Sequence, residues 1–396
     1  MYRSLAALAV GVFAIGTDTF VIAGILPAIT TSLGVSTTTA GQLITAYALS
    51  YAVLSPIMAA VTARWPRKRL LLAGLAVFVV GNLVTVFAQA FGLVLASRVI
   101  AGLGSAMVTP ASTATAAALA PPERRGWAIA VVMTGLSAST ALGAPIGTAL
   151  GGITGDWRAT MYFVVVLGVL AMLGVAVLMP KVAPPPAVSL RERLAPIADL
   201  RVGLTLGTTL LVYTGLYTVY SYISLSFDRV TGGDGTVLAV LLLVWGLAGT
   251  AGTLGAGVLT DRLGNRRVIN TVVIVAALDF ALLPWTSRYP ATAVIALIVW
   301  GLCGWGALPA QTHRLISTLP AAAPLLTGLA SATVYVGVSL AAAVGAAGMA
   351  LAGPYRLGLF GAVLIALALG CAELAHRAIR ARSATADTVL TGARSR

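Results

Sequence analysis

A stretch reading GVLTDRLGNRR at residues 257–267 carries the same pattern as AAVTARWPRKR at residues 59–69. The two stretches are 198 residues apart, which is half the length of the 396-residue chain, and each follows a long apolar run. The matching positions are Leu259 with Val61, Thr260 with Thr62, Arg262 with Arg64, Arg266 with Lys68 and Arg267 with Arg69. This agreement predicts a chain built from two similar halves.

The composition predicts a membrane protein. Hydrophobic residues make up 59% of the sequence and charged residues only 9%, whereas a soluble domain carries about 25% charged residues. Because so few charges cannot cover a water-exposed surface of this size, we expect a polytopic membrane protein. Cys303 and Cys371 both lie in apolar runs, which suits neither a disulfide framework nor a metal site. The first apolar run is too long for a removable signal peptide and lacks its cleavage site.

Twelve apolar runs are long enough to cross a bilayer as helices, which takes about 20 residues each. They cover residues 5–28, 40–62, 69–89, 92–117, 125–150, 158–179, 203–226, 236–258, 268–286, 291–312, 325–350 and 356–376. Continuous apolar runs without period-two alternation exclude a closed β-barrel. The expected fold is therefore an all-α membrane protein with twelve transmembrane helices in two six-helix halves.

The basic residues lie almost entirely on one side of this layout. Of the 25 Lys and Arg residues, Arg98 falls inside a span and only Arg158, Arg229, Arg288 and Arg356 fall on the side opposite the N-terminus. The remaining basic residues share a side with both termini, which the positive-inside rule assigns to the cytoplasm. The net charge of +14 then faces anionic lipid, and nucleic acid is excluded as a partner. The Ala-, Gly- and Arg-rich composition indicates a bacterial cytoplasmic membrane.

The chain divides near its middle. Residues 181–202 are rich in proline and charge, which predicts a cytoplasmic linker between an N-terminal half at 1–180 and a C-terminal half at 203–378. The Arg-rich residues 379–396 are expected to form a cytoplasmic tail that is largely disordered. Repeated six-helix halves are typical of secondary transporters, whose halves rock around a site near the bilayer midplane. A monomer is the default expectation.

Four stretches resemble motifs of the major facilitator superfamily, and the resemblance covers about the whole chain. The stretch at 257–267 looks like its signature loop, which implies roles there for Gly257, Asp261, Arg262, Gly264, Arg266 and Arg267. The first-half copy departs from that pattern, with Ala63 in place of the acid. The stretches GTDTFVIAGILP at 16–27, RVIAGLGSA at 98–106 and GLSASTALGAPIGTALGG at 135–152 are similar to motifs of the twelve-span drug:proton antiporters. That group includes the chloramphenicol-resistance and arabinose-efflux-like permeases.

A glycine-rich stripe runs along the fifth span. Its small residues recur every fourth position, which lets a neighbouring backbone approach one helical face closely. Pro145 leaves the carbonyl four residues before it without a helical partner and bends the helix. The antiporter resemblance implies a hinge between the halves, and the alternative is ordinary small-residue packing. The stripe consists of Gly135, Ser139, Gly143, Gly147 and Gly151.

Asp18 and Arg98 are the only charges of the first half placed well inside the bilayer. Because a charge at this depth needs a partner, we expect the two side chains to interact. Burial raises the pKa of a carboxyl group and a nearby cation lowers it, so an acid whose surroundings change during transport can carry a proton. The alternatives are a permanently ionised structural partner of Arg98, an acid held by Thr17 and backbone, and an Arg98 that snorkels outward.

Several polar and aromatic groups in other spans are candidates for a substrate cavity. Tyr51 and Tyr217 lie deep in their spans and offer a flat apolar face with one hydroxyl. Gln311 lies near the inner end of the tenth span, and Asp279 is the second acid within a span. The alternatives for these groups are interfacial aromatic residues and a polar pair near the outer edge.

The function that these observations predict is proton-coupled export of a small hydrophobic or amphipathic drug-like compound by alternating access. Export of a sugar, nucleoside or other metabolite is the first alternative. Uptake or facilitated diffusion comes next and is disfavoured by the motif of the fifth span, and a membrane receptor or scaffold ranks last. No Walker loop and no catalytic motif is present, so neither nucleotide-driven pumping nor enzyme activity is expected. The expected partners are a small-molecule substrate, protons and the lipid bilayer, with no cofactor and no metal.

Overall fold

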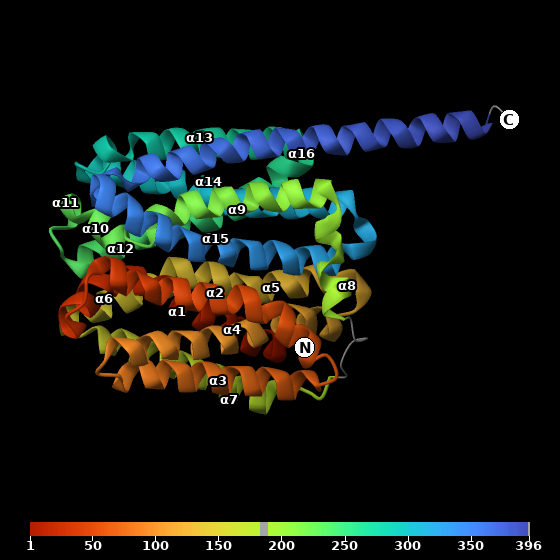
Figure 1. Ribbon diagram of the computed structural model, residues 1–396. Coiled ribbons are helices and arrows are strands. Elements are labelled where there is room, and N and C mark those ends of the chain that lie inside the picture. The colour runs from red at the N-terminus through yellow and green to blue at the C-terminus, as the bar shows by residue number, and fades with distance from the viewer. Residues whose placement is uncertain (183–188, 395–396) are drawn as a thin grey trace.

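The computed structural model describes residues 1–182 and 189–394, without the side chains at 122, 261, 321, 324 and 383–394. In this part of the chain every regular element is helical and no strand occurs. Twelve helical segments within the described residues are long and apolar enough to cross a membrane, which confirms the predicted fold class. Figure 1 shows them running roughly parallel to one another.

The N-terminal half contains six spans, of which the fifth is divided. Its helices are α1 (Tyr2–Leu33), α2 (Thr37–Val61), α3 (Arg67–Phe87), α4 (Phe91–Leu119), α5 (Arg125–Ala138) continued by α6 (Ala144–Thr154), and α7 (Trp157–Leu178). A π-helical turn, η2 (Ser139–Gly143), joins α5 to α6 immediately before Pro145. Because Pro145 has no amide hydrogen to donate, regular α-helical bonding is interrupted at the position that the sequence predicted.

The C-terminal half contains the other six spans. Its helices are α9 (Leu200–Tyr220), α12 (Gly235–Leu263), α13 (Asn265–Thr286), α14 (Pro290–Thr318), α15 (Ala323–Ala352) and α16 (Leu357–Arg394). The seventh span is shorter than the predicted 203–226, because α9 ends at Tyr220 and two short helices follow, α10 (Ile223–Ser226) and α11 (Asp228–Thr231). Residues 379–394 continue α16 where the sequence predicted a disordered tail, since Ala and Arg are strong helix formers.

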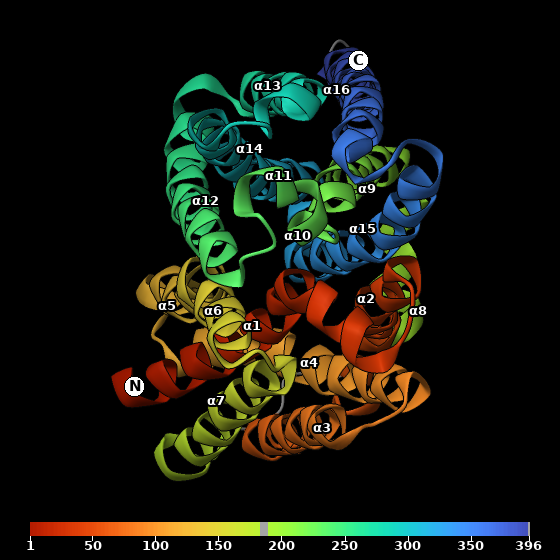
Figure 2. The same cartoon turned by 90° about the vertical axis from the view of Figure 1, so that its left-hand side faces the viewer.

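The two halves lie side by side (Figures 1 and 2). One end of the bundle holds the N-terminus, the end of α16 and the short helix α8 (Leu190–Leu194), and it is called the linker end below. The opposite end, with α10 and α11, is called the far end. The two largest contacts between the halves are α2 with α15 and α12 with η2 and α6, and α1 also contacts α10 and α12. In the view along the bundle, α1 lies between these two contacts.

The predicted signature loop is largely helical. Gly257 and Arg262 belong to the last turns of α12, and Arg266 and Arg267 belong to the first turn of α13. Only Gly264 turns the chain between the two helices, with φ 80° and ψ 152°, a conformation that favours glycine. The side chain of Asp261 lies outside the described residues. The stretch at 257–267 therefore consists mostly of helix ends, with the chain reversal at Gly264, and the roles implied for its residues stay a prediction.

A charged cap fixes the start of α9, where the linker ends. Asp199 caps the helix by accepting a hydrogen bond from the backbone N–H of Arg201 at 2.9 Å. The Arg201 side chain donates two more to the same carboxylate, at 3.0 and 2.6 Å. These charged hydrogen bonds lower the pKa of Asp199 to about 2. The linker residues 183–188 lie outside the described part.

The glycine stripe of the fifth span lies against α1 of its own half. A Cβ atom on Gly135 would collide with the backbone carbonyl of Ala9, and one on Gly143 would collide with Thr17. The contact with the C-terminal half uses the other face of the same span, where Gly246 of α12 meets the Thr140 backbone. The stripe thus seats α1 closely, and its predicted role as a hinge between the halves stays a prediction.

Replacing Gly135 with Ala should destabilise the protein. The added methyl group meets the rigid carbonyl of Ala9, so α1 and α5 must separate, and such overpacking costs about 1–3 kcal/mol. The measurement is thermal unfolding of the purified protein in detergent. Gly126→Ala on the same helix is the matched control, because its Cβ would meet nothing within 4 Å. Equal melting temperatures for the two variants would contradict the packing described.

Candidate functional site

Asp18 and Arg98 form a buried ion pair between α1 and α4. The Arg98 Nη1 atom donates to the Asp18 Oδ1 atom at 2.7 Å, and the exposed fractions of the two side chains are 1% and 0%. Arg98 also reaches the backbone carbonyl of Asp18 through Nη2 at 3.5 Å. The predicted contact is confirmed, and Arg98 does not snorkel outward. The role of the pair in proton coupling stays a prediction.

Two neighbours complete the surroundings of the pair. Asn82 of α3 donates to the Asp18 Oδ2 atom at 3.4 Å, and its carbonyl oxygen accepts from Arg98 Nη1 at 3.4 Å. The Arg98 guanidinium lies 4.5 Å from the ring centre of Tyr47 on α2, which is close enough for a cation–π interaction. Three helices of the N-terminal half therefore surround the carboxylate of α1.

One hydrogen-bond donor of the ion pair lacks a partner. Within the described part, the Nε atom of Arg98 is buried without a hydrogen-bond partner. The Tyr47 hydroxyl donates instead to Ser105 at 2.7 Å and accepts from Thr19 at 3.1 Å. Because burial makes an unpartnered charge costly, any proton added to Asp18 must be accompanied by a new partner for Arg98. The site can thus store a proton only if its neighbours rearrange.

Aromatic side chains from both halves meet beside α1. Phe20 stacks on Tyr217 with ring centres 6.3 Å apart, and Trp305 lies edge-on to Phe20 at 5.7 Å. The Tyr220 hydroxyl of α9 donates to the Phe20 carbonyl of α1 at 3.0 Å, which ties the halves together. This aromatic cluster consists of Phe20, Tyr213, Tyr217, Tyr220, Trp245, Trp300 and Trp305.

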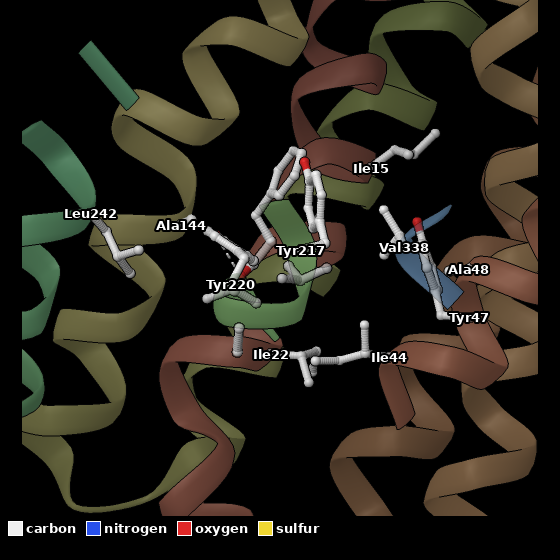
Figure 3. Packing of buried hydrophobic residues seen from close by; sticks show 14 of the residues in the cluster. Ile15, Ile22, Ile44, Tyr47, Ala48, Ala144, Tyr217, Tyr220, Leu242 and Val338 are labelled. Atoms are coloured by element: carbon white, nitrogen blue, oxygen red, sulfur yellow. Dashed lines mark hydrogen bonds between the residues drawn. The ribbon is translucent and has the colours of Figure 1, made fainter. Parts of the chain in front are cut away.

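The aromatic cluster encloses a small cavity. Its volume is only about 10 Å³, and it is lined by residues of α9, α12 and α14. Ligand pockets usually measure about 300–1,000 Å³, so the halves must separate before a drug-sized molecule fits. Figure 3 shows Tyr217 and Tyr220 among buried side chains of α1, α2, α6, α12 and α15, labelled Ile15, Ile22, Ile44, Tyr47, Ala48, Ala144, Leu242 and Val338.

The other predicted cavity residues, Tyr51, Gln311 and Asp279, lie in different parts of the molecule. Tyr51 of α2 stacks on Tyr335 of α15 with ring centres 3.7 Å apart, so it lies with Tyr217 at the contact between the halves. Gln311 is buried near the linker end of α14, and neither amide atom has a partner in the described part. Asp279 lies on α13, which packs chiefly against α14 and α16. The structure does not bring Asp279 to the ion pair.

Several residues of the site escaped the prediction from sequence. Asn82 carries a detectable signal, because it is an amide within the otherwise apolar run VVGNLV at 79–84. Trp245 and Trp305 carry none, since single tryptophans in apolar spans are also common at lipid interfaces. Among the described residues, no group of three His, Cys, Asp or Glu side chains could hold a metal ion.

Comparisons with known proteins place this geometry in a family. The family model for the Major Facilitator Superfamily matches residues 8–346. The MFS-type transporter YtbD of Bacillus subtilis is 32% identical over 333 residues, which cover 83% of each chain. The inner membrane transport protein YdhP of Escherichia coli is 28% identical, over 92% of this chain and 94% of its own.

A drug-resistance protein and a solved transporter are also similar. The chloramphenicol resistance protein of Streptomyces lividans is 34% identical over 64% of this chain and 66% of its own. A bacterial homologue of the human lysosomal transporter Spinster, in an inward-facing and occupied conformation, superimposes with a TM-score of 0.78. It covers 94% of this chain and 96% of its own at 19% identity, which shows the fold alone. The chain therefore belongs to the major facilitator superfamily and is a multi-pass membrane transporter rather than an enzyme.

Proposed function

We propose that this transporter exports small hydrophobic or amphipathic drug-like compounds in exchange for protons. The observation that carries the proposal is the fully buried Asp18–Arg98 pair, with its 2.7 Å contact and its hydrogen-bonded neighbour Asn82. A carboxylate inside a membrane span is costly and usually marks a functional site. Substrate export in one direction is then driven by proton entry in the other.

The helix α1 connects the proton site to the substrate site. Asp18 and Phe20 are two residues apart, so their side chains project from nearly opposite faces of the helix. Asp18 contacts Arg98 and Asn82 within the N-terminal half, whereas Phe20 contacts Tyr217 and other rings of the C-terminal half. A substrate that displaces Phe20 moves the backbone that holds Asp18. Binding and deprotonation are thereby coupled through one turn of α1.

Alternating access changes the surroundings of Asp18. When the halves separate at one end, the bond from Tyr220 to the Phe20 carbonyl breaks and water reaches α1. The Asp18 carboxylate is stabilised by Arg98 while the pair is intact, and it accepts a proton once that contact lengthens. Water then supplies the new partner that Arg98 needs while Asp18 is neutral, and Tyr47 stays beneath the guanidinium. Each conformation thus favours one protonation state.

The aromatic cluster supports the proposed substrate class. Aromatic rings offer large apolar faces, and the Tyr hydroxyls add a few hydrogen bonds for orientation. No charged side chain is among the described residues that line its cavity, which favours neutral or weakly polar molecules. The relative from Streptomyces lividans is named for resistance to chloramphenicol, a compound of this kind.

The proposed orientation places the linker end in the cytoplasm. The basic residues at 64–69, 124–125 and 262–267 belong to helix ends or turns at the linker end, and those at 377–382 lie in the later turns of α16, which run toward that end. The positive-inside rule assigns such an end to the cytoplasm. Both termini would then be cytoplasmic, and Asp18 would receive its proton from the far end when that end opens.

Drug resistance in an efflux-deficient bacterial host tests the proposal. Expression of the chain should raise the minimal inhibitory concentration of chloramphenicol or another uncharged amphipathic drug. Trp245→Ala should abolish the gain, because it removes the ring that contacts Phe20, Tyr220 and Trp305. Trp285→Ala is the matched control, since Trp285 is 56% exposed on α13. No resistance to any compound across drug classes would refute export of drugs.

A further inference from the structure

A second cavity opens at the linker end of the C-terminal half. It has a volume of about 470 Å³ and lies where the start of α13, the end of α14 and the later turns of α16 meet. We call it the basic cavity. Its described lining residues are Leu263, Gly264, Asn265, Arg266, Arg267, Arg314, Ser317, Thr318, His376, Ile379 and Arg380. No proposed step of transport uses it.

The basic cavity carries a surplus of positive charge. Its described lining includes four arginines and no acidic side chain. The nearby carboxylate of Glu373 is already engaged by Arg266, in a bidentate contact at 3.0 and 2.7 Å. Asn270 donates a further hydrogen bond to it at 2.6 Å. Three guanidinium groups, those of Arg267, Arg314 and Arg380, remain without a carboxylate among the described residues.

Arg314 gives the main indication that this cavity binds a ligand. Only 4% of Arg314 is exposed, and its one described hydrogen bond runs from Nη1 to the Ala372 carbonyl at 3.3 Å. Its Nη2 atom is buried without a partner, and so is the Nε2 atom of His376 on the same wall. A buried guanidinium without a counter-charge is expensive, so an anion in the cavity would stabilise the protein.

The N-terminal half offers an internal comparison. At the junction of α2, α3 and α4, which the repeat relates to α12, α13 and α14, a smaller cavity of about 110 Å³ includes Arg67 and Arg193 in its lining. The linker helix α8 contributes Arg193, which donates to the Ala59 carbonyl at 3.4 Å. The chain's own linker therefore lines part of this smaller cavity. No described segment does the same for the basic cavity.

We propose that the basic cavity binds a phosphate group, carried by an anionic lipid or by a soluble molecule. Planar guanidinium groups hold phosphate oxygens through paired, charge-assisted hydrogen bonds. The N-terminus of α13 begins at Asn265 on the cavity wall, where the helix dipole and free N–H groups favour an anion. Basic pockets between transmembrane helices at a membrane surface suit lipid headgroups, and the open mouth also admits soluble phosphates.

The test measures thermal stability of the full chain against two probes. One arm compares nanodiscs of phosphatidylglycerol with nanodiscs of phosphatidylcholine, and the other titrates inorganic phosphate onto protein in neutral detergent at constant ionic strength. The variants are Arg314→Gln and the double variant Arg267→Gln/Arg380→Gln, which changes only exposed positions. Arg64→Gln is the control, because Arg64 is an exposed arginine of the repeat-related turn outside both cavities.

The wild type should melt at a higher temperature with at least one of the two probes. Each variant of the cavity should weaken that response by about tenfold or more in probe concentration, because each removes charge-assisted hydrogen bonds to the phosphate. The control should respond like the wild type. A response to phosphatidylglycerol alone identifies a lipid headgroup, and a response to phosphate identifies a soluble source. Absence of both responses, or equal responses in the double variant and the wild type, would overturn the proposal. The outcome is independent of whether drugs or protons are transported.

Discussion

Asp18→Asn should abolish substrate accumulation driven by a pH gradient while preserving exchange of substrate for substrate. Asparagine has nearly the shape of aspartate but cannot bind and release a proton, so the coupled step is lost and the conformational cycle with bound substrate remains. Everted membrane vesicles or proteoliposomes measure both activities with the same labelled compound. Accumulation should fall to the level of vesicles without the protein, and exchange should stay within about threefold of the wild type, because the substrate contacts are unchanged.

Asp279→Asn is the matched control for this prediction. Asp279 is another acid within a transmembrane span, but it lies on α13, which packs chiefly against α14 and α16. The Asp279→Asn variant should retain gradient-driven accumulation. If Asp18→Asn kept gradient-driven accumulation and its dependence on pH, the carboxylate would serve only as a structural partner of Arg98. If Asp279→Asn alone abolished it, the coupling site would lie in the other half.

Arg98→Ala should cost the largest share of stability of any single change considered. It leaves the Asp18 carboxylate, 0% exposed, without its cation, and breaking a buried pair in this way costs about 3–5 kcal/mol. Unfolding in detergent, followed by heat or by a denaturant, measures the loss. The double variant Asp18→Asn/Arg98→Gln should recover much of it, because neither residue then carries an uncompensated charge.

Arg288→Ala provides the comparison for Arg98→Ala. Arg288 is exposed in the turn between α13 and α14, so its loss should change the free energy of unfolding by less than about 0.5 kcal/mol. Equal stabilities of Arg98→Ala and Arg288→Ala would mean that the ion pair contributes nothing net. A double variant no more stable than Arg98→Ala would mean that packing of the guanidinium, rather than its charge, is what the fold requires.

The ion pair could be predicted from the sequence because the bilayer leaves so few options. A charge deep in a span must find a partner, and the first half offers one acid and one base at depth, Asp18 and Arg98. The twelve spans could also be predicted, because charged residues are too few to interrupt the long apolar runs. The internal repeat then divides them into two halves without any knowledge of side-chain packing.

The rest of the site could not be predicted because it depends on which helix faces meet. The glycine stripe shows that small residues let another helix approach, but the pattern does not say that the partner is α1 rather than the other half. The aromatic cluster joins α1 with α9, α12 and α14, which are remote in sequence. The end of α9 at Tyr220 lies within an apolar run, where hydropathy continues although the helix does not.

The most direct test of proton coupling is proton release from the detergent-solubilised protein when substrate is added. In a weakly buffered solution with a pH indicator, the wild type should release protons in proportion to bound substrate, because binding beside Phe20 favours the ionised Asp18–Arg98 pair. Asp18→Asn should bind the same substrate and release none. Substrate binding without proton release in the wild type, or equal release in both proteins, would contradict the account.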